Sequence, residues 1–271
     1  MERIKRAERL SAIAHILTTT PNRIHGFSEF CDMFGAAKST ISEDIDILSK
    51  SFARFTDGQV ETLAGAAGGV RYRITPRPER VKTTLDILCE RLSEPGRMLP
   101  GGFLYTSDIT TESDTVSAIA ELIASAYYDA APDLVLTMET KGIPIATEVA
   151  RMLDVPLVIA RRDSRAYEGS SVKINYIAGN GVDLETMALA RRAVKPGQKA
   201  LIVDDFMKAG GTLRGMSDLM GEFQVDVVGI AVLISASRET AEKLNVKSLL
   251  CFDNIDETNN RAVGRSTGHF E

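Results

Sequence analysis

The stretch from Leu201 to Leu213 reads LIVDDFMKAGGTL and predicts a buried strand, a glycine turn and the start of a helix. The apolar residues before Asp204 are typical of a strand inside a parallel sheet. Gly210 and Gly211 let the backbone approach a ligand closely, and Thr212 opens the helix. Because backbone N–H groups at a helix N-terminus bind anions, we expect this turn to hold a phosphate group.

Two carboxylates, Asp204 and Asp205, stand beside this phosphate loop. They would repel a phosphate, so we expect them to accept hydrogen bonds from neutral groups such as the adjacent hydroxyls of a ribose. A second anion site is predicted after the strand expected at Leu134–Met138, where Lys141 and backbone N–H groups could bind a pyrophosphate with Mg²⁺ bridging its oxygens. The predicted residues of this second site are Thr140, Lys141, Gly142 and, at the next strand end, Arg161.

Strands and helices alternate through the C-terminal part of the chain. This order predicts an α/β fold, a parallel sheet covered by helices on both faces, with ligands at the carboxyl ends of the strands. Strands are expected at Leu134–Met138, Leu157–Ala160, Lys199–Val203, Val225–Ile234 and Ser248–Phe252, and a hairpin at Val172–Ala178 and Leu184–Ala190 around Gly179–Gly181.

Residues 1–75 predict a separate domain of three helices followed by a hairpin, the order of a winged helix-turn-helix. The first two helices are expected at Ile4–Thr19 and Phe27–Phe34, and strands at Gln59–Leu63 and Val70–Ile74. The third helix should enter the DNA major groove by its N-terminal end, with Ser39 or Thr40 as cap and a capping box from Thr40 to Glu43. The candidate DNA-binding residues are Arg6, Lys38, Ser39, Thr40, Ser42 and Arg71.

A purely structural alternative for this domain is a helical cap or dimerisation domain whose charges are solvated. The acidic residues Glu43, Asp44 and Asp46 favour it, because they would repel DNA phosphates. The charge distribution favours DNA: residues 1–82 have a net charge of +3, whereas the remainder has −8. A connector over residues 76–110 should pack on the second domain, residues 76–271.

The overall composition is that of a globular protein long enough for two domains, with 271 residues of which 44% are hydrophobic. A run of apolar residues long enough to span a membrane is absent, and the charged first residues argue against a secretory signal, so we expect a cytoplasmic protein. We expect no metal site, because the histidines and the reduced cysteines lack ligand spacing: His15, His25, His269, Cys31, Cys89 and Cys251.

The glycine loop resembles the motif of a known family. Val203–Asp205 through Gly210–Thr212, preceded by Lys195–Gln198, is similar to the phosphoribosyl pyrophosphate (PRPP) binding motif of the type I phosphoribosyltransferases, especially the adenine and xanthine branches. Together with the winged helix, the whole chain resembles the purine operon repressors of Gram-positive bacteria. The further segments that carry this resemblance are Leu99–Gly102, Thr140–Gly142 and Glu168–Tyr176.

The resemblance implies a homodimeric repressor that binds double-stranded operator DNA and is released by PRPP, a signal rather than a substrate. Purine nucleotides would be plausible competitors. The residues that the resemblance assigns to PRPP are Asp204, Asp205, Lys208, Ala209, Gly210, Gly211, Thr212, Lys141 and Gly142.

An active purine phosphoribosyltransferase with an accessory domain is the alternative. Active members of the adenine branch usually have Ala-Thr before Gly-Gly-Thr, whereas this chain has Lys208-Ala209. That exchange favours binding over turnover, because an interaction made equally in the ground and transition states does not accelerate a reaction. Phe206 stands where a base would lie, and either stacks on a purine or packs in the core; Phe103 has the same two interpretations.

Overall fold

The computed structural model describes residues 4–65, 68–99, 103–163, 169–178, 183–256 and 261–270. Two compact units make up the chain, the first formed by residues up to Arg77 together with Arg151–Asp154 and the second by the remainder. Within the described ranges, no helix has both the length and the apolar character that a membrane span requires.

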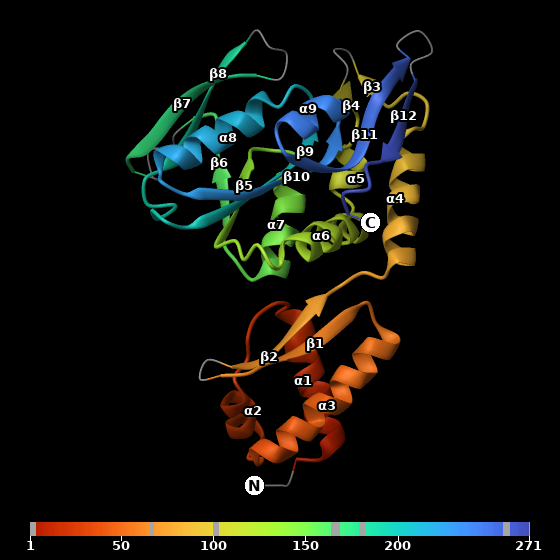
Figure 1. The fold of residues 1–271 in the computed structure, drawn as a ribbon, viewed down its shortest axis with the longest axis vertical. Coiled ribbons are helices and arrows are strands. Elements are labelled where there is room, and N and C mark those ends of the chain that lie inside the picture. The colour runs from red at the N-terminus through yellow and green to blue at the C-terminus, as the bar shows by residue number, and fades with distance from the viewer. Residues whose placement is uncertain are drawn as a thin grey trace. The chain divides into compact units, whose positions relative to one another are not determined.

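The N-terminal unit has the predicted order of three helices and a hairpin (Figure 1). Its elements are α1 (Arg6–Thr19), α2 (Phe27–Phe34), α3 (Lys38–Phe55), β1 (Gly58–Leu63) and β2 (Gly69–Ile74). The two strands pair antiparallel, with Val60 opposite Tyr72. Apolar side chains from all five elements meet in one core, which includes Ile13, Phe30 and Ile41. Ile41, Ile45 and Leu48 are buried and form the inner face of α3.

The predicted cap of α3 is wrong. The helix begins at Lys38 with Ala37 as its N-cap, and no side-chain cap is found there among the described residues. Ser39 and Thr40 lie inside the first turn because the helix starts earlier than expected. Their hydroxyls therefore do not take the capping position, and the first-turn N–H groups remain available to an external acceptor.

The C-terminal unit is built on a six-stranded sheet with strand order β12-β11-β10-β9-β5-β6. All neighbours pair parallel except β12, which pairs antiparallel with β11. The strands are β5 (Leu134–Met138), β6 (Leu157–Ala160), β9 (Lys199–Met207), β10 (Asp226–Ser235), β11 (Val246–Asp256) and β12 (Arg261–Ser266). The predicted parallel α/β sheet is confirmed, and the antiparallel edge strand β12 was not predicted.

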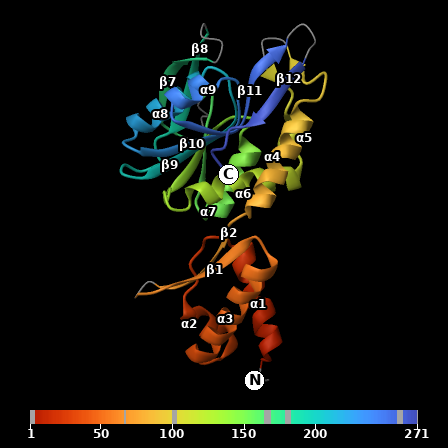
Figure 2. The ribbon, with the colours of Figure 1, turned by 45° about the vertical axis from the view of Figure 1, so that its right-hand side comes forward.

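Helices cover both faces of this sheet (Figures 1 and 2). The helices α8 (Gly211–Glu222) and α9 (Arg238–Lys243) lie on one face, and α6 (Ser113–Tyr127) and α7 (Ile143–Leu153) lie on the other. The chain passes from β9 to β10 in one direction along the sheet and from β5 to β6 in the opposite direction. Right-handed crossovers therefore place α8 and α7 on opposite faces. The connecting elements are α4 (Pro78–Leu92), β3 (Met98–Leu99), β4 (Phe103–Leu104) and α5 (Ser107–Thr110).

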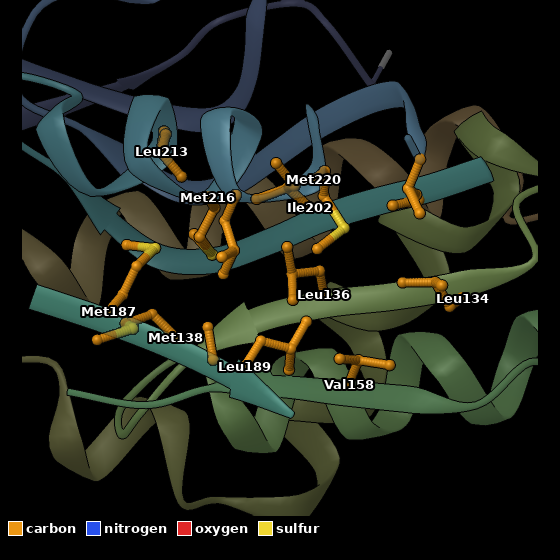
Figure 3. Close-up of a cluster of buried hydrophobic side chains, with 14 of the residues drawn as sticks. Leu134, Leu136, Met138, Val158, Met187, Leu189, Ile202, Leu213, Met216 and Met220 are labelled. Carbon is orange, nitrogen blue, oxygen red and sulfur yellow. The ribbon is translucent and has the colours of Figure 1, made fainter. Parts of the chain in front are cut away.

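A separate hairpin of β7 (Ser171–Ile177) and β8 (Leu184–Ala190) packs along α8. The predicted turn at Gly179–Gly181 lies outside the described residues. Figure 3 shows the core that joins hairpin, helix and sheet: Met187 and Leu189 of β8 face Leu136 and Met138 of β5, with Met216 of α8 above them. This packing holds the hairpin over the carboxyl end of the sheet.

Candidate functional site

The topological switch point of the sheet lies between β5 and β9. These neighbours start crossovers that leave toward opposite edges, which makes their carboxyl ends the switch point where ligands of open α/β sheets bind. A cavity of about 400 Å³ opens there, between the strand ends, the start of α8 and the β7–β8 hairpin. The predicted site residues that line it are Thr140, Lys141, Asp204, Asp205, Phe206, Lys208, Gly210, Gly211 and Thr212.

The phosphate loop depends on its two glycines. Gly210 adopts a left-handed conformation with φ of 75° as the N-cap of α8. A Cβ atom on Gly211 would lie 1.9 Å from the carbonyl oxygen of Ile177 in the hairpin, so only glycine fits between loop and hairpin. Gly210, Gly211 and Thr212 line the cavity at the start of α8, where backbone N–H groups can bind an anion.

The two carboxylates lie within β9, because this strand runs on to Met207 instead of ending at Val203. Asp204 is 8% exposed and Asp205 is 7% exposed. Burial raises the pKa of Asp204 well above its usual value, and the adjacent charge of Asp205 adds to this effect. Burial also raises the pKa of Asp205, although the positive charge of Lys141 opposes the shift. Hydrogen-bond donors brought by a ligand would stabilise both carboxylates.

Three predicted site residues do not line the cavity. Gly142 packs against the Asp204 side chain, since a Cβ atom on Gly142 would lie 2.4 Å from Oδ1 of Asp204. Ala209 is exposed outside the lining. Arg161 pairs by backbone hydrogen bonds with Ala188 and holds β6 to the hairpin, and its neighbour Arg162 lines the cavity in its place.

Two phenylalanines form one wall of the cavity. The ring centroids of Phe103 and Phe206 lie 6.0 Å apart with an interplanar angle of 47°. Nζ of Lys208 lies 5.1 Å from the centroid of the Phe103 ring, a cation–π contact. Phe103 is 46% exposed and both rings line the cavity, so the interpretation of these rings as core residues is wrong.

The hairpin contributes cavity residues that the sequence analysis did not assign. The hydroxyl of Tyr176 donates a hydrogen bond of 2.6 Å to the Glu185 carboxylate, and these residues are cross-strand partners. The predicted bounds of the hairpin left its register open, so the sequence did not single out this pair. The further lining residues are Met138, Glu139, Ala178, Asp183, Met207 and Leu213. In the described ranges, no group of three His, Cys, Asp or Glu side chains has the arrangement of a metal site.

The N-terminal end of α3 presents the second candidate surface. Lys38, Ser39 and Ser42 are exposed there, whereas Thr40 is half-buried. The acidic residues that favoured the alternative are paired within the unit: Asp44 with Arg6 and Arg9, and Asp46 with Lys50.

Two predicted DNA-binding arginines take part in such ion pairs. Arg6 pairs with Glu43 at 2.8 Å and keeps a half-exposed side chain. Arg71 is only 17% exposed and pairs with Glu61 at 2.8 Å. Of these two, Arg6 is the better placed to reach a DNA phosphate.

Comparison with known proteins agrees with both units. Residues 5–74 match the family model of the N-terminal domain of the bacterial purine repressor, and residues 106–265 match the phosphoribosyl transferase domain. The adenine phosphoribosyltransferase of Thermoanaerobacter pseudethanolicus shares the second fold, with a TM-score of 0.54 and 20% identity over 62% of this chain and 99% of that structure.

Two relatives extend over most of the chain. The purine biosynthesis transcriptional repressor PurR of Bacillus subtilis is 40% identical over 86% of this chain and 82% of its own length. The purine biosynthesis transcriptional activator PurR of Lactococcus lactis subsp. lactis is 40% identical over 94% of this chain and 95% of its own length. This chain therefore belongs to the family of bacterial purine biosynthesis transcriptional regulators, in which a DNA-binding N-terminal domain precedes a phosphoribosyltransferase fold.

Proposed function

We propose that this protein is a cytoplasmic repressor of purine synthesis genes, which binds operator DNA as a homodimer and is released when PRPP binds its C-terminal unit. The observation that carries the proposal is a single cavity lined by the phosphate loop at Gly210–Thr212, the buried acids Asp204 and Asp205, and Lys141. The loop, the acids and Lys141 match the 5-phosphate, the ribose and the pyrophosphate of PRPP, respectively.

In this proposal the 5-phosphate binds the N–H groups at the start of α8, and the ribose hydroxyls donate to Asp204 and Asp205. The pyrophosphate binds at Thr140 and Lys141. Mg²⁺ would be held chiefly by the pyrophosphate oxygens, because this ion keeps much of its hydration and takes few protein ligands beside a phosphate. A purine nucleotide that carries the same phosphates would compete for the cavity, with Phe103 and Phe206 beside its base.

A regulatory role fits the loop better than turnover does. Lys208 adds a fixed cation at the cavity, and Ala209 lacks the hydroxyl that threonine would offer at that position. Such a loop binds the ground state of the ligand without favouring a transition state. The full-length relatives are regulators, which agrees with this assignment.

On DNA, the N-terminal end of α3 would lie in the major groove. Lys38 and the hydroxyls of Ser39, Thr40 and Ser42 would reach phosphates and base edges there, with Arg6 on the flank and Arg71 only after its pair with Glu61 opens. A homodimer would present two such helices to a two-fold symmetric operator.

Calorimetric titration of the full chain with PRPP and Mg²⁺ tests the ligand assignment. We expect saturable binding with one site per chain. A parallel incubation with PRPP and adenine, guanine or xanthine should yield no nucleotide. Nucleotide formation at a rate typical of an enzyme would overturn the regulatory assignment.

A further inference from the structure

The cavity contains more carboxylates than cations. Its described lining has five carboxylates, on Glu139, Asp183, Glu185, Asp204 and Asp205, and three cationic side chains, on Lys141, Arg162 and Lys208. The ribose accounts for Asp204 and Asp205 in the proposed function. Glu185 has no such part in binding a ligand whose phosphates are strongly negative. It lies on β8, the partner of the strand β7 whose end contacts the phosphate loop.

Glu185 contacts one hydrogen-bond donor and one cationic side chain, both of which would also suit a phosphate. Its carboxylate accepts the hydrogen bond of 2.6 Å from the Tyr176 hydroxyl, and its Oε2 lies 3.9 Å from Nε of Arg162. The Thr212 side chain, in the phosphate loop, lowers the pKa of Tyr176, against the larger effects of burial and Glu185. A hydroxyl of the hairpin and a guanidinium that follows β6 are thus both turned to one internal anion at the cavity.

Tyr176 can serve only one acceptor with its proton. Burial and the Glu185 carboxylate raise the pKa of Tyr176 to about 12, so the hydroxyl stays protonated at neutral pH. Its single hydrogen goes to Glu185 in this structure. A phosphate bound beside Thr212 could accept the same hydrogen and attract the same Arg162 charge, while Glu185 would repel it.

We propose that Glu185 is an internal competitor of the anionic ligand and thereby sets the ligand concentration at which the protein responds. The inference rests on the proposed function, in that the ligand is taken to be PRPP, but its physical basis holds for any phosphate at the loop. Ligand binding must break or weaken the Glu185 contacts with Tyr176 and Arg162. Removing the charge of Glu185 removes this cost and strengthens binding.

Glu185→Gln is the direct variant because the amide keeps the shape of the side chain and still accepts a hydrogen bond from Tyr176. We expect the Kd of PRPP with Mg²⁺, measured by calorimetry on the full chain, to fall about tenfold. Glu222→Gln is the matched control, since Glu222 is exposed at the end of α8 and lies outside the lining. It removes the same charge and should change the Kd less than about twofold.

A second comparison separates competition from general electrostatics. In a Tyr176→Phe background the shared donor is gone, so Glu185→Gln should strengthen binding less than it does in the unaltered protein. An equal gain in both backgrounds would show that Tyr176 is not shared and would overturn the competition. Thermal unfolding of each variant verifies that the hairpin remains folded.

Inorganic phosphate, titrated into the same proteins, distinguishes this inference from the proposed function. If PRPP does not bind but Glu185→Gln still strengthens phosphate binding, the competitor role stands and the PRPP assignment falls. If PRPP binds the unaltered protein and Glu185→Gln leaves its Kd unchanged or raises it, the competitor role falls and the PRPP assignment stands. Failure of both ligands to bind overturns both.

Discussion

Nε of Arg9 donates a hydrogen bond of 2.7 Å to Oδ2 of Asp44, and both residues are buried where α1 crosses α3. This pair ties the helix proposed to read DNA to the body of the N-terminal unit. The acidic residue that seemed to oppose DNA binding in the sequence is therefore a structural anchor for the DNA-binding helix.

Asp44→Asn should destabilise the N-terminal unit by about 3 kcal/mol, because it leaves the buried Arg9 without its counter-charge. Hydrogen exchange of the α1 and α3 amides in the full chain measures this loss. Asp46→Asn is the control, since Asp46 forms an exposed pair with Lys50 on the same helix and should change stability by less than about 1 kcal/mol. Equal effects of the two variants would contradict the anchoring role.

Gly211→Ala should weaken PRPP binding at least about tenfold. The added Cβ meets the backbone of Ile177, which cannot rotate away as a flexible side chain could, so loop and hairpin must separate. Calorimetry gives the Kd, and operator binding without PRPP should remain normal.

Gly221→Ala is the matched control in the same helix. Among the described residues, no atom lies within 4 Å of a Cβ built on Gly221. Alanine there should leave the Kd unchanged and stabilise the helix by about 0.5–1 kcal/mol. A higher Kd in the Gly221→Ala control would mean that any change in α8 affects the cavity.

Asp204→Asn should stabilise the protein at neutral pH while it weakens PRPP binding. The folded-state pKa of Asp204 is raised, so its contribution to stability is complete below the usual aspartate pKa of about 4 and is lost as the pH rises through the folded value. The variant escapes this loss because it carries no charge. Urea unfolding as a function of pH should show an advantage of about 1 kcal/mol or more at pH 7 that disappears near pH 4. An advantage that grows toward low pH would contradict the assignment.

Lys38→Ala should weaken operator binding about fivefold and reduce the salt dependence by about one counterion, because one phosphate contact is lost. Its affinity for PRPP should be unchanged. Lys50→Ala, in the C-terminal half of α3 and paired with Asp46, is the control and should bind operator DNA almost normally. Similar losses in both variants would place the DNA contacts elsewhere on the unit.

The sequence was sufficient for those features that depend on neighbouring residues. The glycines after β9 and the element order of both units follow from local patterns, because turns need glycine and buried parallel strands need continuous apolar runs. The predicted end of β9 at Val203 is wrong. The two aspartates are typical of a loop, but β9 continues to pair with β10 as far as Met207 and so keeps them in the strand.

Features that join distant segments could not be predicted in this way. Successive strand residues point to opposite faces, so the sequence alone did not distinguish Arg161, which holds the hairpin, from Arg162, which lines the cavity. Tyr176 and Glu185 reach the phosphate loop only because the hairpin packs on α8. Gly142 was assigned to the ligand, but its space is taken by Asp204.

Binding of the full chain to the promoter DNA of purine synthesis genes, followed by gel shift with increasing PRPP, tests the central claim most directly. The unaltered protein should retard the DNA, and PRPP with Mg²⁺ should release it, whereas the Asp204→Asn protein should remain bound at the same PRPP concentrations. Release of both proteins at equal PRPP, or tighter binding of the unaltered protein when PRPP is added, would contradict the account.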